Sequence, residues 1–134
     1  MTVHCDHLFV YGTLRRDSGH HMHQVLARDA EFIDHASFRG RMFLVARYPG
    51  VVESDEKSDR IVGDVFRLRA TSADLLRRLD RYEACDPRNP EAPYIRAIRR
   101  VTLDSGEVLD AWVYLYRRST TALARIANGD FLAR

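Results

Sequence analysis

Cysteine, lysine and long apolar runs are scarce in this sequence, and each scarcity argues against a class of protein. There are only two cysteines, Cys5 and Cys85, and no Cys-x-x-Cys pair, so a disulfide framework is not expected. No stretch approaches the roughly 20 apolar residues of a membrane-spanning helix, and the N-terminus lacks the charged head and apolar run of a signal peptide. We therefore expect a protein of the reducing cytoplasm that has no membrane partner.

An excess of one charge is also lacking. The 21 basic and 19 acidic residues leave a formal net charge of +2, and Lys57 is the only lysine. The arginines are spread along the chain, often in pairs such as Arg15-Arg16 and Arg99-Arg100. Since a nucleic-acid-binding protein usually gathers a larger basic excess on one face, this balance favours solvated surfaces and predicts no nucleic-acid partner.

The chain also lacks any internal boundary. Its 134 residues are close to the usual size of one domain, and no repeat, low-complexity tract or Gly/Pro/Ser-rich linker divides them. We therefore expect residues 1–134 to form a single domain. Three prolines between Cys85 and Pro93 predict a rigid surface loop there.

Short apolar segments bounded by turn residues predict the secondary structure. We expect strands at 7–11, 32–48 with an interruption at Gly40, 61–68, 94–103 and 108–116, helices at 20–28, 71–83 and 119–128, and a turn at Pro49-Gly50. The last two strands flank Asp104-Ser105-Gly106, which predicts a hairpin. Because strands and helices do not alternate regularly, the pattern favours an α+β fold with a mostly antiparallel, barrel-like sheet.

The clearest predicted helix, 71–83, ends in a carboxylate. Thr71 and Asp74 have the spacing of a capping box at its start. At 100° per residue Glu83 falls on the same arc as the leucines of the helix, and its arginines fall on the other side. Burial and the negative end of the helix dipole both raise the pKa of a carboxyl group. Glu83 is therefore a candidate general acid-base; the alternative is a helix-end carboxylate paired with an arginine.

A turn after the first predicted strand is a candidate binding site. Gly12 directly follows the apolar run that ends at Tyr11, and a glycine lets the backbone turn sharply and approach a ligand. Successive amides through Thr13 and Leu14 can form a nest for a carboxylate or phosphate. A plain structural turn is the alternative. Without a Gly-x-Gly-x-x-Gly or Walker motif, nucleotide binding is unsupported.

Metal and nucleophile motifs are incomplete. His20, His21 and His23 form a tract, but no second group of ligands at metal spacing and no His-Glu-x-x-His motif accompanies it, so we expect no metal. A Ser-His-Asp triad stays open, because its members need not be adjacent in sequence. No Gly-x-Ser-x-Gly elbow supports it.

Two of these segments together resemble the gamma-glutamylcyclotransferase-like superfamily, and within it the short AIG2-like group that includes gamma-glutamylamine cyclotransferase. They are the sequence Y-G-T-L-R at residues 11–15 and L-D-R-Y-E at residues 79–83. The resemblance covers nearly the whole chain in the family's order. Its further matches are Tyr48-Pro49-Gly50, Gly63-Asp64-Val65-Phe66, Tyr94-x-Arg96, Ala111-Trp112-Val113-Tyr114 and Asn128-Gly129-Asp130.

This resemblance implies a small mixed barrel flanked by short helices, with a pocket at one side and no cofactor. It implies that Glu83 moves the proton and that backbone amides of the Y-G-T-L turn bind the γ-glutamyl part of the substrate. The turn residues are Tyr11, Gly12, Thr13 and Leu14. Tyr94 and Arg96 are second candidates for the pocket, although plain strand alternation explains them as well.

The implied reaction is attack of the substrate's α-amine on its own γ-carbonyl, which releases pyroglutamate and an amine or amino acid. Two alternatives stay open: a non-catalytic binding or regulatory module with the same fold, and a tailoring enzyme that removes a γ-glutamyl group from a specialised metabolite. The sequence departs from the family after Glu83, where many relatives have glycine. Here Ala84-Cys85 leads into the triple-proline loop, so the leaving group is the least defined part of the substrate.

Overall fold

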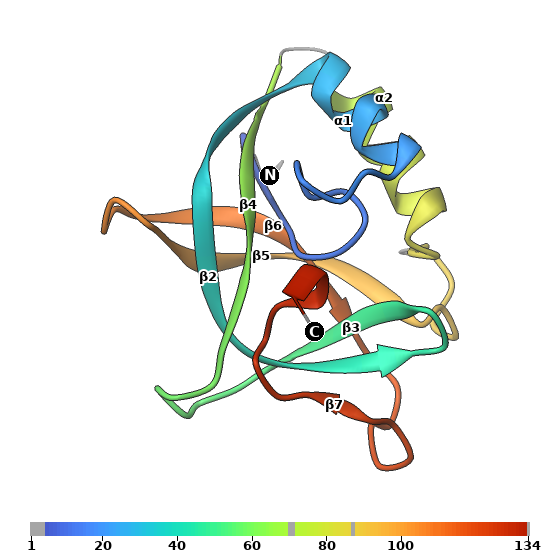
Figure 1. The fold of residues 1–134 in the computed structure, drawn as a ribbon. Coiled ribbons are helices and arrows are strands. Elements are labelled where there is room, and N and C mark those ends of the chain that lie inside the picture. The colour runs from blue at the N-terminus through green and yellow to red at the C-terminus, as the bar shows by residue number, and fades with distance from the viewer. Residues whose placement is uncertain (1–4, 70–71, 87, 134) are drawn as a thin grey trace.

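The computed structural model describes residues 5–69, 72–86 and 88–133, and Figure 1 shows their arrangement. In chain order the elements are β1 (His7–Val10), α1 (His21–Asp29), β2 (Ala30–Val45), β3 (Tyr48–Glu53), β4 (Arg60–Leu68), α2 (Ser72–Tyr82), β5 (Tyr94–Leu103), β6 (Val108–Tyr116), β7 (Arg125–Ile126) and a 3-10 helix (Phe131–Ala133). None of the helices in these ranges is long and apolar enough to cross a membrane.

Five of the strands close into a barrel. They neighbour one another in the order β2, β4, β1, β6 and β5, and β5 returns to β2 through the pairs Ala36–Leu103 and Ser37–Thr102. Only the β1–β6 pairing among these is parallel. The two α-helices lie together beside one end of the barrel (Figure 1). The predicted α+β class, with a small mixed and mostly antiparallel barrel, is therefore confirmed.

The long strand β2 serves two pairings. Its first part, through Arg39, pairs with β4, and its second part, from Gly40, pairs with β3 outside the barrel. The predicted interruption at Gly40 is therefore a change of partner within a continuous strand. A Cβ atom at Gly40 would lie 2.7 Å from the Val52 carbonyl oxygen, so glycine permits the close approach of β3.

The predicted turn at Pro49-Gly50 is wrong. Both residues lie in β3, and the turn between β2 and β3 is made by Ala46 and Arg47, with Ala46 at φ 55°. Gly50 is needed for packing, because a Cβ there would lie 2.7 Å from the Val45 side chain. A Pro-Gly pair is typical of a turn, but here pairing with β2 keeps both residues in a strand.

The predicted helix at 119–128 is also wrong. This segment contains turns and the short strand β7, which pairs with Met42 and Phe43 of β2. The Asp59 carboxylate holds the strand by accepting hydrogen bonds from Arg125 at 2.8 Å and from Arg41 at 2.6 Å. These tertiary contacts override the weak helical propensity of the segment.

Two apolar cores explain the continuous apolar character of β1. Phe9 packs inside the barrel, whereas Leu8 and Val10 face the second core, which contains Leu75 and Leu79 of α2. A strand buried on both faces reads as an unbroken apolar run. Since Leu75 and Leu79 are almost fully buried, α2 is fixed against the barrel and its last turn is held near the end of β1.

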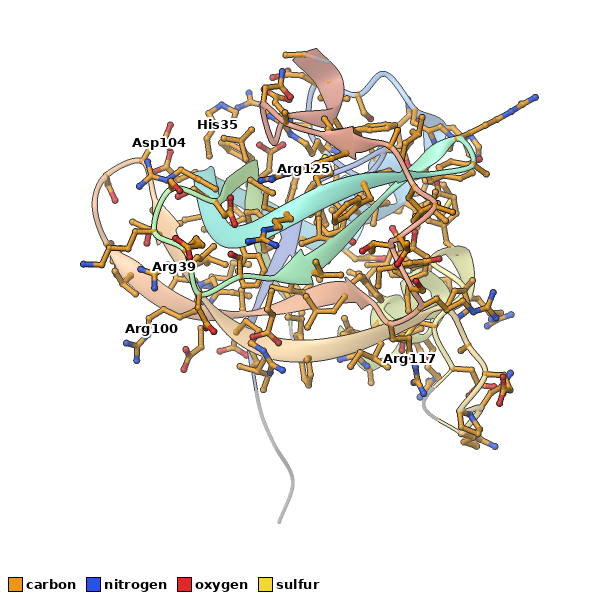
Figure 2. All side chains as sticks on the ribbon, turned by 90° about the horizontal axis from the view of Figure 1, so that it is seen from below. His35, Arg39, Arg100, Asp104, Arg117 and Arg125 are labelled. Atoms are coloured by element: carbon orange, nitrogen blue, oxygen red, sulfur yellow. The ribbon has the colours of Figure 1, made fainter. Side chains whose placement is uncertain are left out.

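Many of the surface arginines are solvated. Arg39 on β2 and Arg100 on β5 are exposed, and Figure 2 shows both pointing away from the barrel. Others form ion pairs, such as Arg78 with Asp29 at 2.9 Å. Surface charges of this kind contribute little to stability one at a time.

Candidate active site

A cavity of about 350 Å³ lies where β1 and α2 both end. The turn after β1 and the end of α2 therefore meet in space. Their contact is between the hydroxyls of Thr13 and Tyr82, which are 69 residues apart in the sequence. The cavity is lined by Phe9, Val10, Tyr11, Gly12, Thr13, Leu14, Val45, Ala46, Tyr48, Pro49, Tyr82, Glu83, Ala84, Tyr94 and Tyr114. All the catalytic and substrate-binding candidates named from the sequence line it except Arg96.

The turn after β1 lines one part of this cavity. The Tyr11 hydroxyl donates to the Tyr114 carbonyl at 2.6 Å, and the Arg15 amide closes the turn by donating to the Gly12 carbonyl at 3.1 Å. Within the described part of the chain, no acceptor takes a hydrogen bond from the amides of Gly12, Thr13 or Leu14. These donors are available to an anionic or carbonyl group of a ligand.

Two contacts tie this turn to its surroundings. A Cβ at Gly12 would lie 2.9 Å from Cγ of Pro49, so β3 packs directly on the glycine. The Pro49 carbonyl in turn accepts a hydrogen bond from the Tyr94 hydroxyl at 3.1 Å. On the other side, the Thr13 and Tyr82 hydroxyls are 2.5 Å apart, which links the turn to α2 one residue before Glu83.

The helix α2 ends in a Schellman motif directly after Glu83. The Cys85 amide donates to the Asp80 carbonyl at 2.8 Å, and the Ala84 amide donates to the Arg81 carbonyl at 3.3 Å. Ala84 has φ 55°, in the left-handed region. Glu83 is therefore the last residue before the chain turns away. Of the predicted capping pair at the other end of α2, Thr71 lies outside the described residues.

The surroundings of the Glu83 carboxyl group raise its pKa. Burial raises its pKa to about 7, and the nearby Asp80 carboxylate adds to this shift. Among the described residues no basic side chain lies within ion-pair distance of Glu83, so the alternative of an arginine-paired helix end is not observed. Burial, followed by the charge of Glu83, also raises the pKa of Tyr94 across the cavity.

Arg96 lies behind the cavity wall. Its guanidinium donates two hydrogen bonds to Asp80, at 2.8 and 3.2 Å, and sits over the Trp112 ring at 4.2 Å. The Tyr114 hydroxyl donates to the same carboxylate at 2.7 Å. Tyr94 lines the cavity, whereas Arg96 holds Asp80 in place.

Two histidines of the tract have local structural partners, and Cys85 is buried. His20 Nδ1 accepts the Met22 amide at 3.1 Å and caps α1, and His23 Nδ1 lies 3.0 Å from the Leu14 carbonyl oxygen. In the described ranges no group of three or more His, Cys, Asp or Glu side chains is arranged to hold a metal ion. Cys85 is buried, and burial raises the pKa of its thiol, which makes the reactive thiolate scarce.

Sequence reasoning missed the wall formed by the β2–β3 hairpin. Val45, Ala46 and Tyr48 line the cavity together with the end of α2. The sequence signal for this wall is Tyr48-Pro49-Gly50, which is one of the segments that resemble the family. The local pattern predicted a turn at Pro49-Gly50 and so concealed that Pro49 lies in a strand that packs on Gly12.

Replacing Ala84 by glycine should stabilise the protein by about 0.5–1 kcal/mol. An L-residue in the left-handed region costs roughly 1–2 kcal/mol, and the extra freedom of glycine in the unfolded chain offsets about half of that gain. Urea unfolding measures the change. Ala127→Gly is the matched control, because Ala127 is exposed and has no positive φ; it should be destabilising. A destabilising Ala84→Gly would contradict the strain assigned to this turn.

Comparisons with known proteins agree with this geometry. A Methanocaldococcus jannaschii protein, assigned by inference as a gamma-glutamylcyclotransferase, is 29% identical over 94% of this chain and 95% of its own. The crystal structure of YkqA from Bacillus subtilis is 27% identical, with a TM-score of 0.68, and this chain spans only 39% of it. An aig2-like protein from Mus musculus has the same fold, with 23% identity, a TM-score of 0.65, and coverage of 92% of this chain and 86% of its own.

A family model also matches almost the whole chain. The model described as gamma-glutamyl cyclotransferase, AIG2-like, matches residues 8–133. This range contains the turn after β1, the end of α2 and the hairpin that together line the cavity. The chain belongs to the gamma-glutamyl cyclotransferase, AIG2-like family.

Proposed function

We propose that the protein is a gamma-glutamyl cyclotransferase that acts on a small γ-glutamyl compound. The observation that carries this proposal is the meeting, in one cavity, of a carboxyl group with a pKa of about 7 and a turn with three unused backbone amides. The cavity volume of about 350 Å³ suits a small molecule. A cytoplasmic location follows from the same proposal, since small γ-glutamyl metabolites are its substrates.

The reaction joins the substrate's α-nitrogen to its γ-carbonyl carbon and breaks the γ-amide C–N bond. Two protons leave the α-ammonium nitrogen as it becomes the lactam N–H, and Glu83, as the carboxylate, accepts them one after the other. As the acid, it passes them to the leaving nitrogen, so pyroglutamate and a protonated amine or amino acid are the products. A pKa near 7 allows one residue to perform both transfers at neutral pH.

The turn after β1 contributes orientation and electrostatic stabilisation. Amides of Gly12, Thr13 and Leu14 would hold the substrate's α-carboxylate or the oxyanion that develops on the γ-carbonyl. Nucleophile and electrophile belong to one molecule, so holding it in a folded shape supplies much of the acceleration. The hydroxyl pair Thr13–Tyr82 keeps this turn at a constant distance from the residue that carries the proton.

Release of pyroglutamate tests the proposal. The protein is incubated with a panel of γ-glutamyl amines and γ-glutamyl amino acids, and pyroglutamate is measured by chromatography, with Glu83→Gln as the control. We expect release from at least one compound by the wild type and strongly reduced release by the variant. Tight binding of a γ-glutamyl compound without turnover would instead show a binding module of the same fold.

A further inference from the structure

The arginine that ends the Y-G-T-L-R sequence is buried between two carboxylates. Arg15 Nη1 lies 2.8 Å from Asp130 Oδ1, and Arg15 Nε lies 3.8 Å from Asp64 Oδ1. Side-chain exposure is 10% for Arg15 and 1% for Asp64. Neither carboxylate lines the cavity. Charges buried to this degree are costly unless they are paired, so the function of the cluster needs an explanation.

Asp64 holds the chain immediately after the turn. It lies on β4 directly opposite Val10, the last residue of β1. Its Oδ2 accepts the backbone amide of Arg16 at 2.7 Å, and its Oδ1 lies 2.8 Å from Nδ1 of His35. His35 itself is anchored at the end of the β5–β6 hairpin, where the Asp104 amide donates to its carbonyl at 2.9 Å (Figure 2).

Asp130 brings the C-terminal segment to the same point. The Val62 amide of β4 donates to the Gly129 carbonyl at 2.8 Å, and a Cβ at Gly129 would lie 2.2 Å from the Arg60 carbonyl oxygen. This close approach, at φ +68°, requires glycine. The Asn128 side chain accepts the Asp130 amide at 3.0 Å. Asp130 is therefore placed beside the barrel wall independently of Arg15.

We infer that Asp64 and Asp130, acting through Arg15, are positioning residues that set the shape of the substrate-binding turn. The turn has two ends: β1 fixes the first, and this cluster fixes the second through both the Arg15 side chain and the Arg16 backbone. The amides of residues 12–14 between them are thereby presented in one arrangement before the ligand arrives. Such preorganisation is what makes backbone donors effective in a binding site. The expected effect on KM rests on the proposed function, whereas the expected effect on the shape of the turn does not.

Asp130→Asn is the principal test, because Asp130 is partly exposed and its loss leaves the buried Asp64 pairing intact. We expect KM for the γ-glutamyl substrate to rise by on the order of 10- to 100-fold, because a displacement of about 1 Å can cost up to on the order of 10². We expect kcat to change much less, because Glu83 and Tyr82 are untouched. Asp64→Asn should act in the same direction. In an Arg15→Gln background, Asp130→Asn should add almost nothing, because the two residues act as a unit.

Asp59→Asn is the matched control. Asp59 likewise holds two arginines, Arg41 and Arg125, at 2.6 and 2.8 Å, but among the described residues it forms no ion pair with Arg15, and it does not line the cavity. It should lower thermal stability and leave KM unchanged. If Asp130→Asn and Asp64→Asn lowered stability as Asp59→Asn does, with KM unchanged, the cluster would be purely structural and the inference would be overturned.

A second measurement keeps the inference separate from the reaction. Backbone amide order parameters of Gly12, Thr13 and Leu14, measured by NMR on the free protein, report the shape of the turn without any substrate. We expect them to fall in Asp130→Asn and to stay at the wild-type level in Asp59→Asn. A protein that releases no pyroglutamate yet shows this pattern would refute the proposed function alone. Unchanged order at residues 12–14 would refute the positioning role alone.

Discussion

Glu83→Gln is expected to lower turnover of γ-glutamyl substrates by on the order of 10²–10⁴, the usual contribution of a positioned acid-base group. Glutamine keeps the shape of the side chain and removes its proton transfer. Substrate affinity should change much less than turnover, because the amides of the turn remain in place. Single-turnover kinetics and calorimetric binding of a slow substrate separate the two quantities. Glu83→Asp should also fail, since one methylene less withdraws the carboxylate from the attacking nitrogen.

The pH dependence gives this prediction its sign. With a pKa of about 7 in the folded protein, the Glu83 carboxylate accumulates as pH rises through 7, so the wild-type rate should rise over that interval and then level off. Glu83→Gln should lose this rise of the rate with pH. Glu91→Gln is a matched control, because Glu91 is exposed on the loop after α2 and does not line the cavity. A Glu83→Gln enzyme with near wild-type rates and the same pH dependence would show that the carboxylate is structural.

The same shift predicts an effect on stability. The pKa of Glu83 is raised on folding, from an ordinary value of 4.5 to about 7. The folded state therefore binds more protons, so this group favours folding below about pH 4.5 and its contribution is lost as pH rises through 7. Glu83→Gln should remove that decline. The free energy of unfolding, measured with urea at pH 5 and pH 8, should therefore be higher for the variant relative to the wild type at pH 8 than at pH 5.

The helical part of the site is the part that residue periodicity predicts well. The apolar positions of residues 71–83 define one face, and the structure places Leu75 and Leu79 of α2 in the second core. The same reasoning identifies Glu83 as a carboxylate next to buried side chains. The strand β1 is equally predictable, because burial on both faces leaves an unbroken apolar run.

Contacts between segments distant in sequence explain what could not be predicted. Nothing local shows that Pro49 lies in a strand that packs on Gly12, or that residues 119–128 form turns around a short strand, β7, held by Asp59. The pairing of Arg15 with Asp130 spans 115 residues. Family resemblance marked both segments of that pair, but only the closed barrel shows that they meet.

Gly12→Val is expected to reduce affinity for γ-glutamyl compounds by on the order of 100-fold or more, with the protein still folded. The backbone of Gly12 has no positive φ, so the substitution causes no backbone strain. The obstruction is steric: the first added carbon would lie 2.9 Å from Cγ and 3.2 Å from Cδ of Pro49. Because Tyr94 holds Pro49 through its carbonyl, the turn has to move, and a displacement of about 1 Å in a binding group costs on the order of 10².

A rescue experiment makes the steric argument specific. Gly12→Ala adds only the Cβ atom and should weaken binding less than Gly12→Val. Pro49→Ala removes the two ring carbons that this Cβ would meet, so the double variant should bind more tightly than Gly12→Ala alone. Gly19→Ala is the control for glycine replacement as such: at φ +72° it strains the backbone, yet nothing lies within 4 Å of the added atom. It should lower stability and leave affinity unchanged. Unchanged calorimetric affinity in a folded Gly12→Val protein would show that the turn after β1 is structural and that its amides do not bind the substrate.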